Sequence, residues 1–177
     1  MSEQFEVFLS REEIAKKVKE MGAQITRDFQ GRDLALIGLL RGCFVFMADL
    51  VRTIDLPLTI DFMEVSSYDD NLTSSGNVKI LKDIKNSIEG KHVLLIEDVI
   101  DTGHTLNFVF EHLTLKRPSW LGIAGLLVKA EKHKFKSPIN YPGFEIPDHF
   151  VMGYGMDVAG KYRNLDHVAI YKNASEM

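Results

Sequence analysis

The stretch that decides the fold is Val93-Leu94-Leu95-Ile96-Glu97-Asp98-Val99-Ile100-Asp101-Thr102-Gly103-His104-Thr105. It begins as a continuous apolar run, typical of a strand buried on both faces, and passes through two adjacent carboxylates into a small polar turn. A helical pattern follows from about residue 105. In an open α/β sheet, ligands bind at the carboxyl ends of the strands, so this junction is the predicted ligand site.

The segments around this junction alternate between strand and helix patterns. Ser10 and Glu13 have the spacing of a capping box, and they begin a helix that reaches about Phe29. Expected strands cover residues 34–40, 57–65, 91–96 and 120–128, further helices about 42–54 and 105–115, and shorter strand-like pieces 150–154 and 167–171. Strands that alternate with helices predict an α/β fold with a mostly parallel central sheet.

The chain is predicted to form one domain over residues 1–177. Its length and its 45% hydrophobic content suit a single compact core. We expect this core at about 10–130, a mobile lid at about 66–76, and a small hood made by the segment of about 131–177 with the N-terminus. An ordinary hairpin connection is an equally good interpretation of the composition of 66–76.

Composition and charge exclude several classes of function. A net charge of -4 argues against general nucleic-acid binding, and no basic run suggests a membrane surface. The first residues lack the pattern of an export signal, and Arg41 and Asp49 interrupt the most apolar stretch. The single cysteine, Cys43, excludes an intrachain disulfide. We therefore expect a soluble, cytoplasmic protein.

The turn after the apolar run has the makings of a phosphate site. Backbone N–H groups from Asp101 to Thr105 would converge at a helix N-terminus, where Gly103 permits close approach and Thr102 and Thr105 add hydroxyl donors. The lysine of a P-loop is missing, and Gly153-Tyr154-Gly155 lacks the third glycine of a dinucleotide fingerprint. A phosphate ligand of another kind is indicated.

Glu97 and Asp98 would repel each other at the end of a buried strand unless something satisfies them. The vicinal hydroxyls of a ribose fit that need, and so does a hard, oxygen-preferring ion such as Mg²⁺. The alternative is a helix-capping aspartate within a solvated acidic turn.

The string from Glu97 to Thr105 closely resembles the signature of type I phosphoribosyltransferases, which bind phosphoribosyl pyrophosphate. The resemblance extends over nearly the whole chain, and it points to the branch that acts on hypoxanthine and guanine. The further matching blocks are Leu40-Arg41-Gly42, Ser67-Tyr68, Leu127-Val128-Lys129, residues 143–148 and Tyr162-Arg163-Asn164-Leu165.

The resemblance implies roles at the carboxyl end of the buried strand. Glu97 and Asp98 would hold the ribose hydroxyls and a magnesium ion. Asp101 would be the catalytic residue, a general base beside the imidazole nitrogen of the purine. The 5-phosphate would be held by Asp101, Thr102, Gly103, His104 and Thr105, with His104 contributing only a backbone contact.

The resemblance also implies where pyrophosphate and purine bind. Arg41, Gly42 and Arg163 would contact pyrophosphate, with a non-proline cis peptide bond at Leu40-Arg41. Relatives have Lys at the position of Arg41, so its side-chain contact stays open. Lys129 would donate to the 6-oxygen of the base. Purine contacts would also come from Ile100, Phe150, Val151 and Asp157, with Asp157 placing a second magnesium ion and with Ser67 and Tyr68 opening the lid.

The implied activity is magnesium-dependent purine salvage. Phosphoribose would pass from phosphoribosyl pyrophosphate to hypoxanthine, and also to guanine, giving IMP or GMP and pyrophosphate. A preference for guanine or xanthine is one alternative, and a non-catalytic regulator that senses phosphoribosyl pyrophosphate on the same fold is another. The expected partners are small-molecule substrates and a second copy of the chain, as homodimer or homotetramer, without nucleic acid or membrane.

Overall fold

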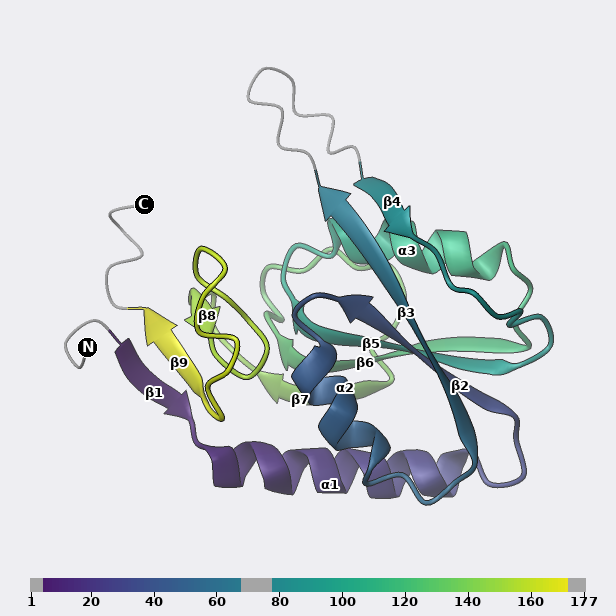
Figure 1. The fold of residues 1–177 in the computed structure, drawn as a ribbon, viewed down its shortest axis with the longest axis horizontal. Helices are drawn as coiled ribbons and strands as arrows, with labels where there is room; N and C mark the ends of the chain where they lie inside the picture. The colour runs from purple at the N-terminus through teal and green to yellow at the C-terminus, as the bar shows by residue number, and fades with distance from the viewer. Residues whose placement is uncertain (1–4, 68–77, 172–177) are drawn as a thin grey trace.

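The computed structural model describes residues 5–67 and 78–171. Within these residues a central sheet has the strand order β4-β3-β2-β5-β6-β7 (Figure 1). The bounds are Val78–Lys82 for β4, Leu58–Ser67 for β3, Leu34–Leu40 for β2, His92–Ile100 for β5, Trp120–Val128 for β6 and Tyr141–Glu145 for β7. All neighbouring pairs are parallel except β3 and β4. The predicted α/β fold with a mostly parallel sheet is confirmed.

Helices cover both faces of this sheet, because alternate residues of the central strands point to opposite sides. On one face, α1 (Arg11–Asp28) and α2 (Phe44–Val51) pack on a cluster that includes Leu34 and Leu36. On the other, α3 (His104–Thr114) packs on a cluster that includes Ala35 and Ile37. β2, β6 and the part of β5 from Val93 to Ile96 are apolar because both of their faces are core.

The capping box predicted for α1 is present. The N–H of Glu13 donates to Ser10 Oγ at 3.2 Å, and the N–H of Ser10 donates to Glu13 Oε2 at 2.8 Å. The helix therefore begins where the sequence pattern places it, at Arg11.

A second, antiparallel sheet has the order β1-β9-β8 and forms the hood. Its strands are β1 (Phe5–Leu9), β9 (Val168–Tyr171) and β8 (Val151–Met152), so both ends of the described chain lie side by side (Figure 1). One boundary of the predicted hood needs correction: β7 lies within residues 131–177 but pairs with β6 in the central sheet. The predicted lid falls mostly outside the described residues.

Among the described residues, no helix combines the length and the apolar character needed to cross a membrane.

Candidate active site

A cleft of about 470 Å³ opens at the carboxyl ends of the parallel strands, under the hood. Its wall brings together most of the residues that the sequence predicted for a site: Arg41, Gly42, Glu97, Asp98, Ile100, Asp101, Thr102, Gly103, Thr105, Lys129, Phe150, Val151, Asp157 and Arg163. These residues come from β5, from the turns that follow β2, β5 and β6, from the start of α3 and from the hood segment, so only the folded sheet unites them.

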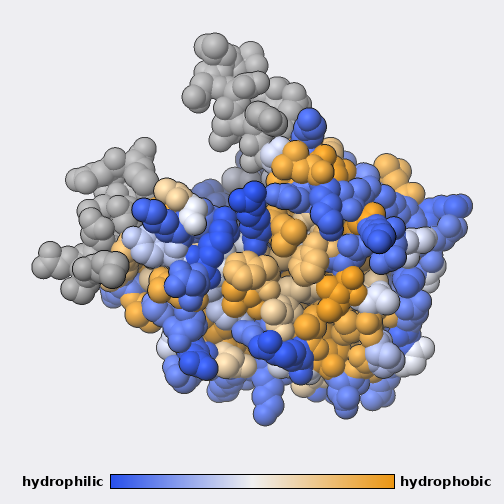
Figure 2. Space-filling view, viewed as in Figure 1, coloured by the Kyte–Doolittle hydropathy of each residue, from blue (hydrophilic) through white to orange (hydrophobic). Residues whose placement is uncertain are grey.

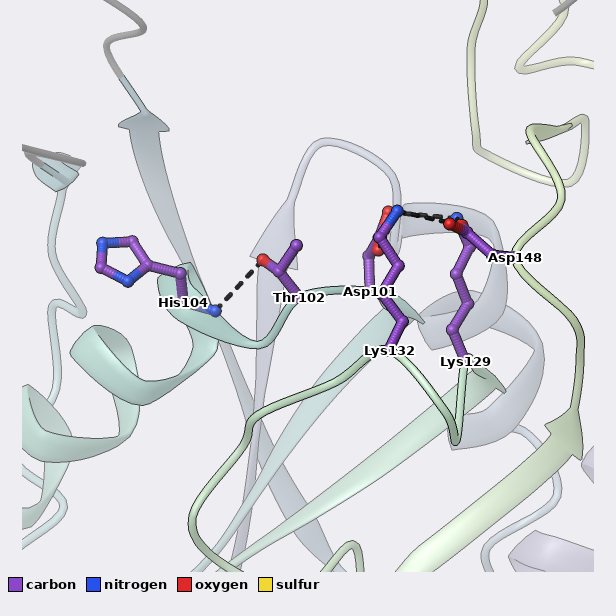
Figure 3. A network of polar contacts seen from close by, with 6 residues as sticks. All are labelled: Asp101, Thr102, His104, Lys129, Lys132 and Asp148. Carbon is purple, nitrogen blue, oxygen red and sulfur yellow. Dashed lines mark hydrogen bonds and ion pairs between the residues drawn. The ribbon is translucent and has the colours of Figure 1, made fainter. Parts of the chain in front are cut away.

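The remaining predicted residues stand apart from this wall. The ring of His104 points away from Asp101, and its backbone N–H donates to Thr102 Oγ1 at 3.4 Å (Figure 3). Ser67 is the last residue of β3, and Tyr68 lies outside the described residues. The lid assignment of Ser67 and Tyr68 stays a prediction.

A larger cavity of about 980 Å³ lies between α1, α2 and the loop of residues 160–166. It shares Arg163 with the cleft but contains none of the residues 97–105. Apolar side chains such as Ile14, Val18 and Val45 form much of its wall. Size alone therefore does not identify the site, because the carboxylates and the helix N-terminus lie in the smaller cleft.

The turn before α3 is shaped to receive an anion. Gly103 is the N-cap of α3 with φ at 78°, so the cap residue has no side chain to bond the N–H groups of the first turn. A Cβ atom at this position would lie 2.9 Å from the backbone nitrogen of Phe135. The N–H of Lys134 also donates to the carbonyl of Thr102 at 2.9 Å. The turn is thus held from behind, with its helix N-terminus facing the cleft, as a phosphate site requires.

The turn after β2 lies between the carboxylates and the hood. The peptide bond between Leu40 and Arg41 is cis, as the resemblance implied. A Cβ atom at Gly42 would lie 1.8 Å from Asp98 Oδ2, and one at Gly155 would lie 2.1 Å from the carbonyl oxygen of Gly42. Only glycines permit this approach. The Arg41 side chain is largely exposed and reaches Glu64 Oε1 at 3.4 Å.

The two adjacent carboxylates on β5 are deeply set and electrostatically unfavourable. Burial raises the pKa of Asp98 to about 6; Asp157 acts in the same direction, while backbone N–H groups and Arg163 oppose it. Burial, with the charge of Asp98, raises the pKa of Glu97 well above its ordinary value. Glu97 Oε2 is buried and has no hydrogen-bond partner among the described residues. Such a pair calls for a cation or for hydroxyl donors.

The donor set fits Mg²⁺ bound together with a substrate. The described residues hold no cluster of three or more metal-binding side chains. Mg²⁺, however, is commonly bound through one or two carboxylates and completes its shell with water and substrate oxygens. Glu97 and Asp98 meet that requirement. Asp157 is already engaged, because Arg163 Nη2 lies 2.6 Å from its Oδ1 and the N–H of Gly160 donates to its Oδ2 at 2.7 Å.

Lys129 directly follows β6, and its side chain is buried in the cleft wall. Its Nζ lies 3.1 Å from Asp101 Oδ2 and 2.8 Å from Asp148 Oδ1. Lys132 Nζ contacts the same two carboxylates, each at 2.9 Å (Figure 3). Sequence reasoning missed Lys132 and Asp148. The block of residues 143–148 was a signal for Asp148, but nothing distinguished Lys132 from surface charge.

The apolar side of the cleft comes from β5 and the hood. Ile100 ends β5 and is buried, while Val151 begins β8 and is also buried. Phe150, just before β8, has 43% of its surface exposed although it is large and apolar. A flat apolar ligand such as a purine ring would cover such a side chain.

The chain belongs to the phosphoribosyltransferase family, because the phosphoribosyl transferase domain matches residues 6–159. Individual relatives within this family carry names that specify the base. A hypoxanthine phosphoribosyltransferase of Haemophilus influenzae is 46% identical over 166 residues, which cover 92% of this chain and 93% of that protein. A hypoxanthine-guanine phosphoribosyltransferase of Bacillus subtilis is 46% identical over 168 residues, covering 95% and 93%.

Solved structures give the same result for the fold. The crystal structure of a hypoxanthine-guanine phosphoribosyltransferase from Bacillus anthracis has a TM-score of 0.90 at 45% identity, and the match covers 95% of this chain and 99% of that one. A hypoxanthine phosphoribosyltransferase from Staphylococcus aureus has a TM-score of 0.91 at 44% identity, covering 97% and 94%. The type I phosphoribosyltransferase fold expected from the sequence is confirmed.

Proposed function

We propose that the protein is a purine salvage enzyme that transfers phosphoribose from phosphoribosyl pyrophosphate to hypoxanthine, and also to guanine. The products are IMP or GMP and pyrophosphate. One observation carries the proposal: the cleft unites a carboxylate pair, a helix N-terminus and a buried lysine in a chain 46% identical to enzymes named for hypoxanthine.

Each part of the substrates finds a partner in this cleft. The N-terminus of α3 holds the 5-phosphate through backbone N–H groups and the hydroxyls of Thr102 and Thr105. Glu97 and Asp98 accept hydrogen bonds from the ribose hydroxyls. Gly42 and Arg163 bind pyrophosphate beside these carboxylates, and Arg41 adds a positive charge there.

The base lies between Phe150 and the end of β5 and is read by Lys129, whose ammonium donates to the 6-oxygen. A purine without that oxygen leaves the buried ammonium one acceptor short, which disfavours adenine. Asp101 accepts the proton from the imidazole nitrogen that attacks ribose C1. General base assistance of this kind contributes about 10²–10⁴ in rate.

We propose Mg²⁺ as the cofactor, held by Glu97 and Asp98 together with substrate oxygens. It supplies positive charge to the departing pyrophosphate. The raised pKa values of the two carboxylates support this assignment. They mean that the ionised pair is unfavourable on its own, and a bound cation would stabilise the ionised form of both groups.

We also propose a homo-oligomer in the cytoplasm. The buried free thiol of Cys43 suits a reducing compartment. Exposed apolar side chains on α2 and β3, including Phe44 and Ile60, support self-association.

The test follows pyrophosphate release with hypoxanthine, guanine, xanthine and adenine offered separately, in the presence of Mg²⁺ and phosphoribosyl pyrophosphate. We expect release with hypoxanthine and guanine, and a fall of about 100-fold or more in Asp101→Ala. Asp55→Asn removes an exposed carboxylate away from the cleft and is expected to leave the rate unchanged. Absence of release with every base would refute the proposal.

A further inference from the structure

Four charged side chains form a closed ring beside the cleft (Figure 3). Asp101 uses both of its oxygens, with Oδ2 3.1 Å from Lys129 Nζ and Oδ1 2.9 Å from Lys132 Nζ. Asp148 Oδ1 lies 2.8 Å from Lys129 Nζ and 2.9 Å from Lys132 Nζ. Positive and negative groups therefore alternate around the ring, and each group has two partners of opposite charge.

The members of this ring differ in burial. The Lys129 side chain is 7% exposed, whereas those of Lys132 and Asp101 are 36% and 43% exposed. A buried ammonium must keep an anionic partner to offset the loss of its hydration. Lys132 has no such need, because water reaches it. Its place between Asp101 and Asp148 calls for another explanation.

The closed ring is a poor state for proton transfer. A carboxylate that lies against two ammonium groups takes up a proton less readily, because both charges favour its ionised form. If a ligand carbonyl oxygen draws Lys129 away from Asp101, the carboxylate keeps one partner, Lys132. Lys129 in turn keeps Asp148. The ring can thus open at the contact between Asp101 and Lys129 without leaving any charge unpaired.

We propose that Lys132 is a positioning residue, which holds the carboxylate of Asp101 charged and in place when a 6-oxopurine draws Lys129 away. Asp148 serves Lys129 in the same way. This inference rests on the proposed function, since it assumes that Asp101 is the base and that Lys129 reads the purine.

The protonation equilibria of the outer members agree with this arrangement. Hydrogen bonds with Asp101 and Asp148 raise the pKa of Lys132, and those with Lys129 and Lys132 lower the pKa of Asp148. Both groups therefore keep their charge throughout the pH range in which the enzyme would work.

The test compares Lys132→Met and Lys132→Arg with wild type in steady-state kinetics. In Lys132→Met we expect kcat with hypoxanthine to fall about tenfold, with KM for phosphoribosyl pyrophosphate changed less than about twofold. Lys132→Arg keeps the charge and should restore most of the rate. A thermal unfolding midpoint within about 2 °C of wild type would show that the fold is intact.

The pH profile separates positioning from a general structural effect. The charged groups that face Asp101 are Lys129 and Lys132, with Asp148 behind them and with Glu97 and Asp98 on the strand that leads to it. Removing the charge of Lys132 leaves the carboxylate of Asp101 with one fewer cation to favour its ionised form, so the acid limb of kcat/KM should move to higher pH. Lys132→Arg should leave that limb in place.

Lys136→Met is the matched control. It removes a lysine four residues further along, whose ion pair with Glu111 at 3.6 Å is well exposed. An active wild type with unchanged kcat and pH profile in Lys132→Met would overturn this inference alone. A wild type that releases no pyrophosphate with any base would overturn the proposed function, and this inference with it.

Discussion

At the residue scale, Asp98 combines a requirement of the proposed chemistry with a cost to the fold. It lies beside Glu97 on β5, with Gly42 so close that no side chain fits between them. Burial raises its pKa to about 6, so ionisation near neutral pH opposes folding. A bound cation and ribose would offset that cost, which links ligand binding to stability.

The first prediction concerns stability against pH in Asp98→Asn. Between the unfolded pKa of 3.8 and the folded pKa of about 6, the native state binds more protons than the unfolded state. The free energy of unfolding contributed by Asp98 is therefore highest below about pH 4 and is lost as pH rises through about 6. Without Mg²⁺, the asparagine variant should be more stable than wild type at pH 7 by on the order of 2 kcal/mol, and equal to it near pH 4.

Urea unfolding in EDTA from pH 4 to 8 measures this difference in the free energy of unfolding. Wild type and Asp98→Asn share all other carboxylates, so the contributions of those groups cancel in the comparison. Asp33→Asn serves as control, because Asp33 is exposed and pairs with Lys91 at 3.7 Å. Adding Mg²⁺ with phosphoribosyl pyrophosphate should reverse the order, since only the wild type keeps the carboxylate. A stability difference independent of pH would contradict the assigned cause.

The sequence located the polar residues of the site better than it located their contacts. Glu97, Asp98 and Gly103 follow an apolar strand within one continuous segment, so local pattern and resemblance suffice to find them. Lys132 and Asp148 are 16 residues apart and meet only because β7 lies parallel beside β6. Their contact depends on sheet pairing, which no local pattern encodes.

At the element scale, strands with continuous apolar patterns were predicted closely, and three of the four strands at sheet edges were missed. β2 and β6 match their predicted ranges because both faces are buried. β1, β4 and β7 were not predicted, since each lies at an edge and is short. Pro142 and Gly143 within β7 argue against a strand, although an edge strand tolerates them. β5 extends to Ile100 because it pairs with β6 there.

The second prediction concerns the contact between the hood and the turn after β2. Gly155 has φ at 101°, and a Cβ atom there would lie 2.1 Å from the carbonyl oxygen of Gly42. The N–H of Gly155 donates to the carbonyl oxygen of Arg163 at 3.0 Å, and Arg163 Nη1 donates to the Gly155 carbonyl at 2.7 Å. Gly155→Ala should push the hood from the turn and reduce kcat/KM for phosphoribosyl pyrophosphate by about tenfold or more.

The control for this prediction is Gly90→Ala. Gly90 also has positive φ, at 75°, but a Cβ atom there meets nothing within 4 Å. Both alanines cost stability through backbone strain, on the order of 1 kcal/mol, whereas only Gly155→Ala displaces the site. Equal kinetic effects of the two substitutions, measured as pyrophosphate release well below their melting temperatures, would contradict the proposed contact.

At the scale of the whole molecule, one face has an apolar surface that the described residues leave uncovered. Figure 2 shows this surface over α2 and β3. Among its exposed side chains, Phe44 and Ile60 have 43% and 44% of their surface open. Contiguous apolar surface of this kind is typical of a protein interface. Phe44 begins α2 directly after the turn that holds Gly42, so an interface here would adjoin the cleft.

The third prediction is that the double variant Phe44→Lys/Ile60→Lys sediments as a single chain, whereas wild type sediments as a dimer or tetramer. Two charges would have to be buried at the contact, and each costs several kcal/mol without a partner. Loss of assembly should also lower pyrophosphate release, because α2 directly follows the turn that contains Gly42.

Leu115→Lys is the control: Leu115 is 82% exposed at the end of α3, which covers the other face of the sheet. Analytical ultracentrifugation decides the matter, since a wild type already monomeric, or a double variant that still assembles, would exclude this face as the interface.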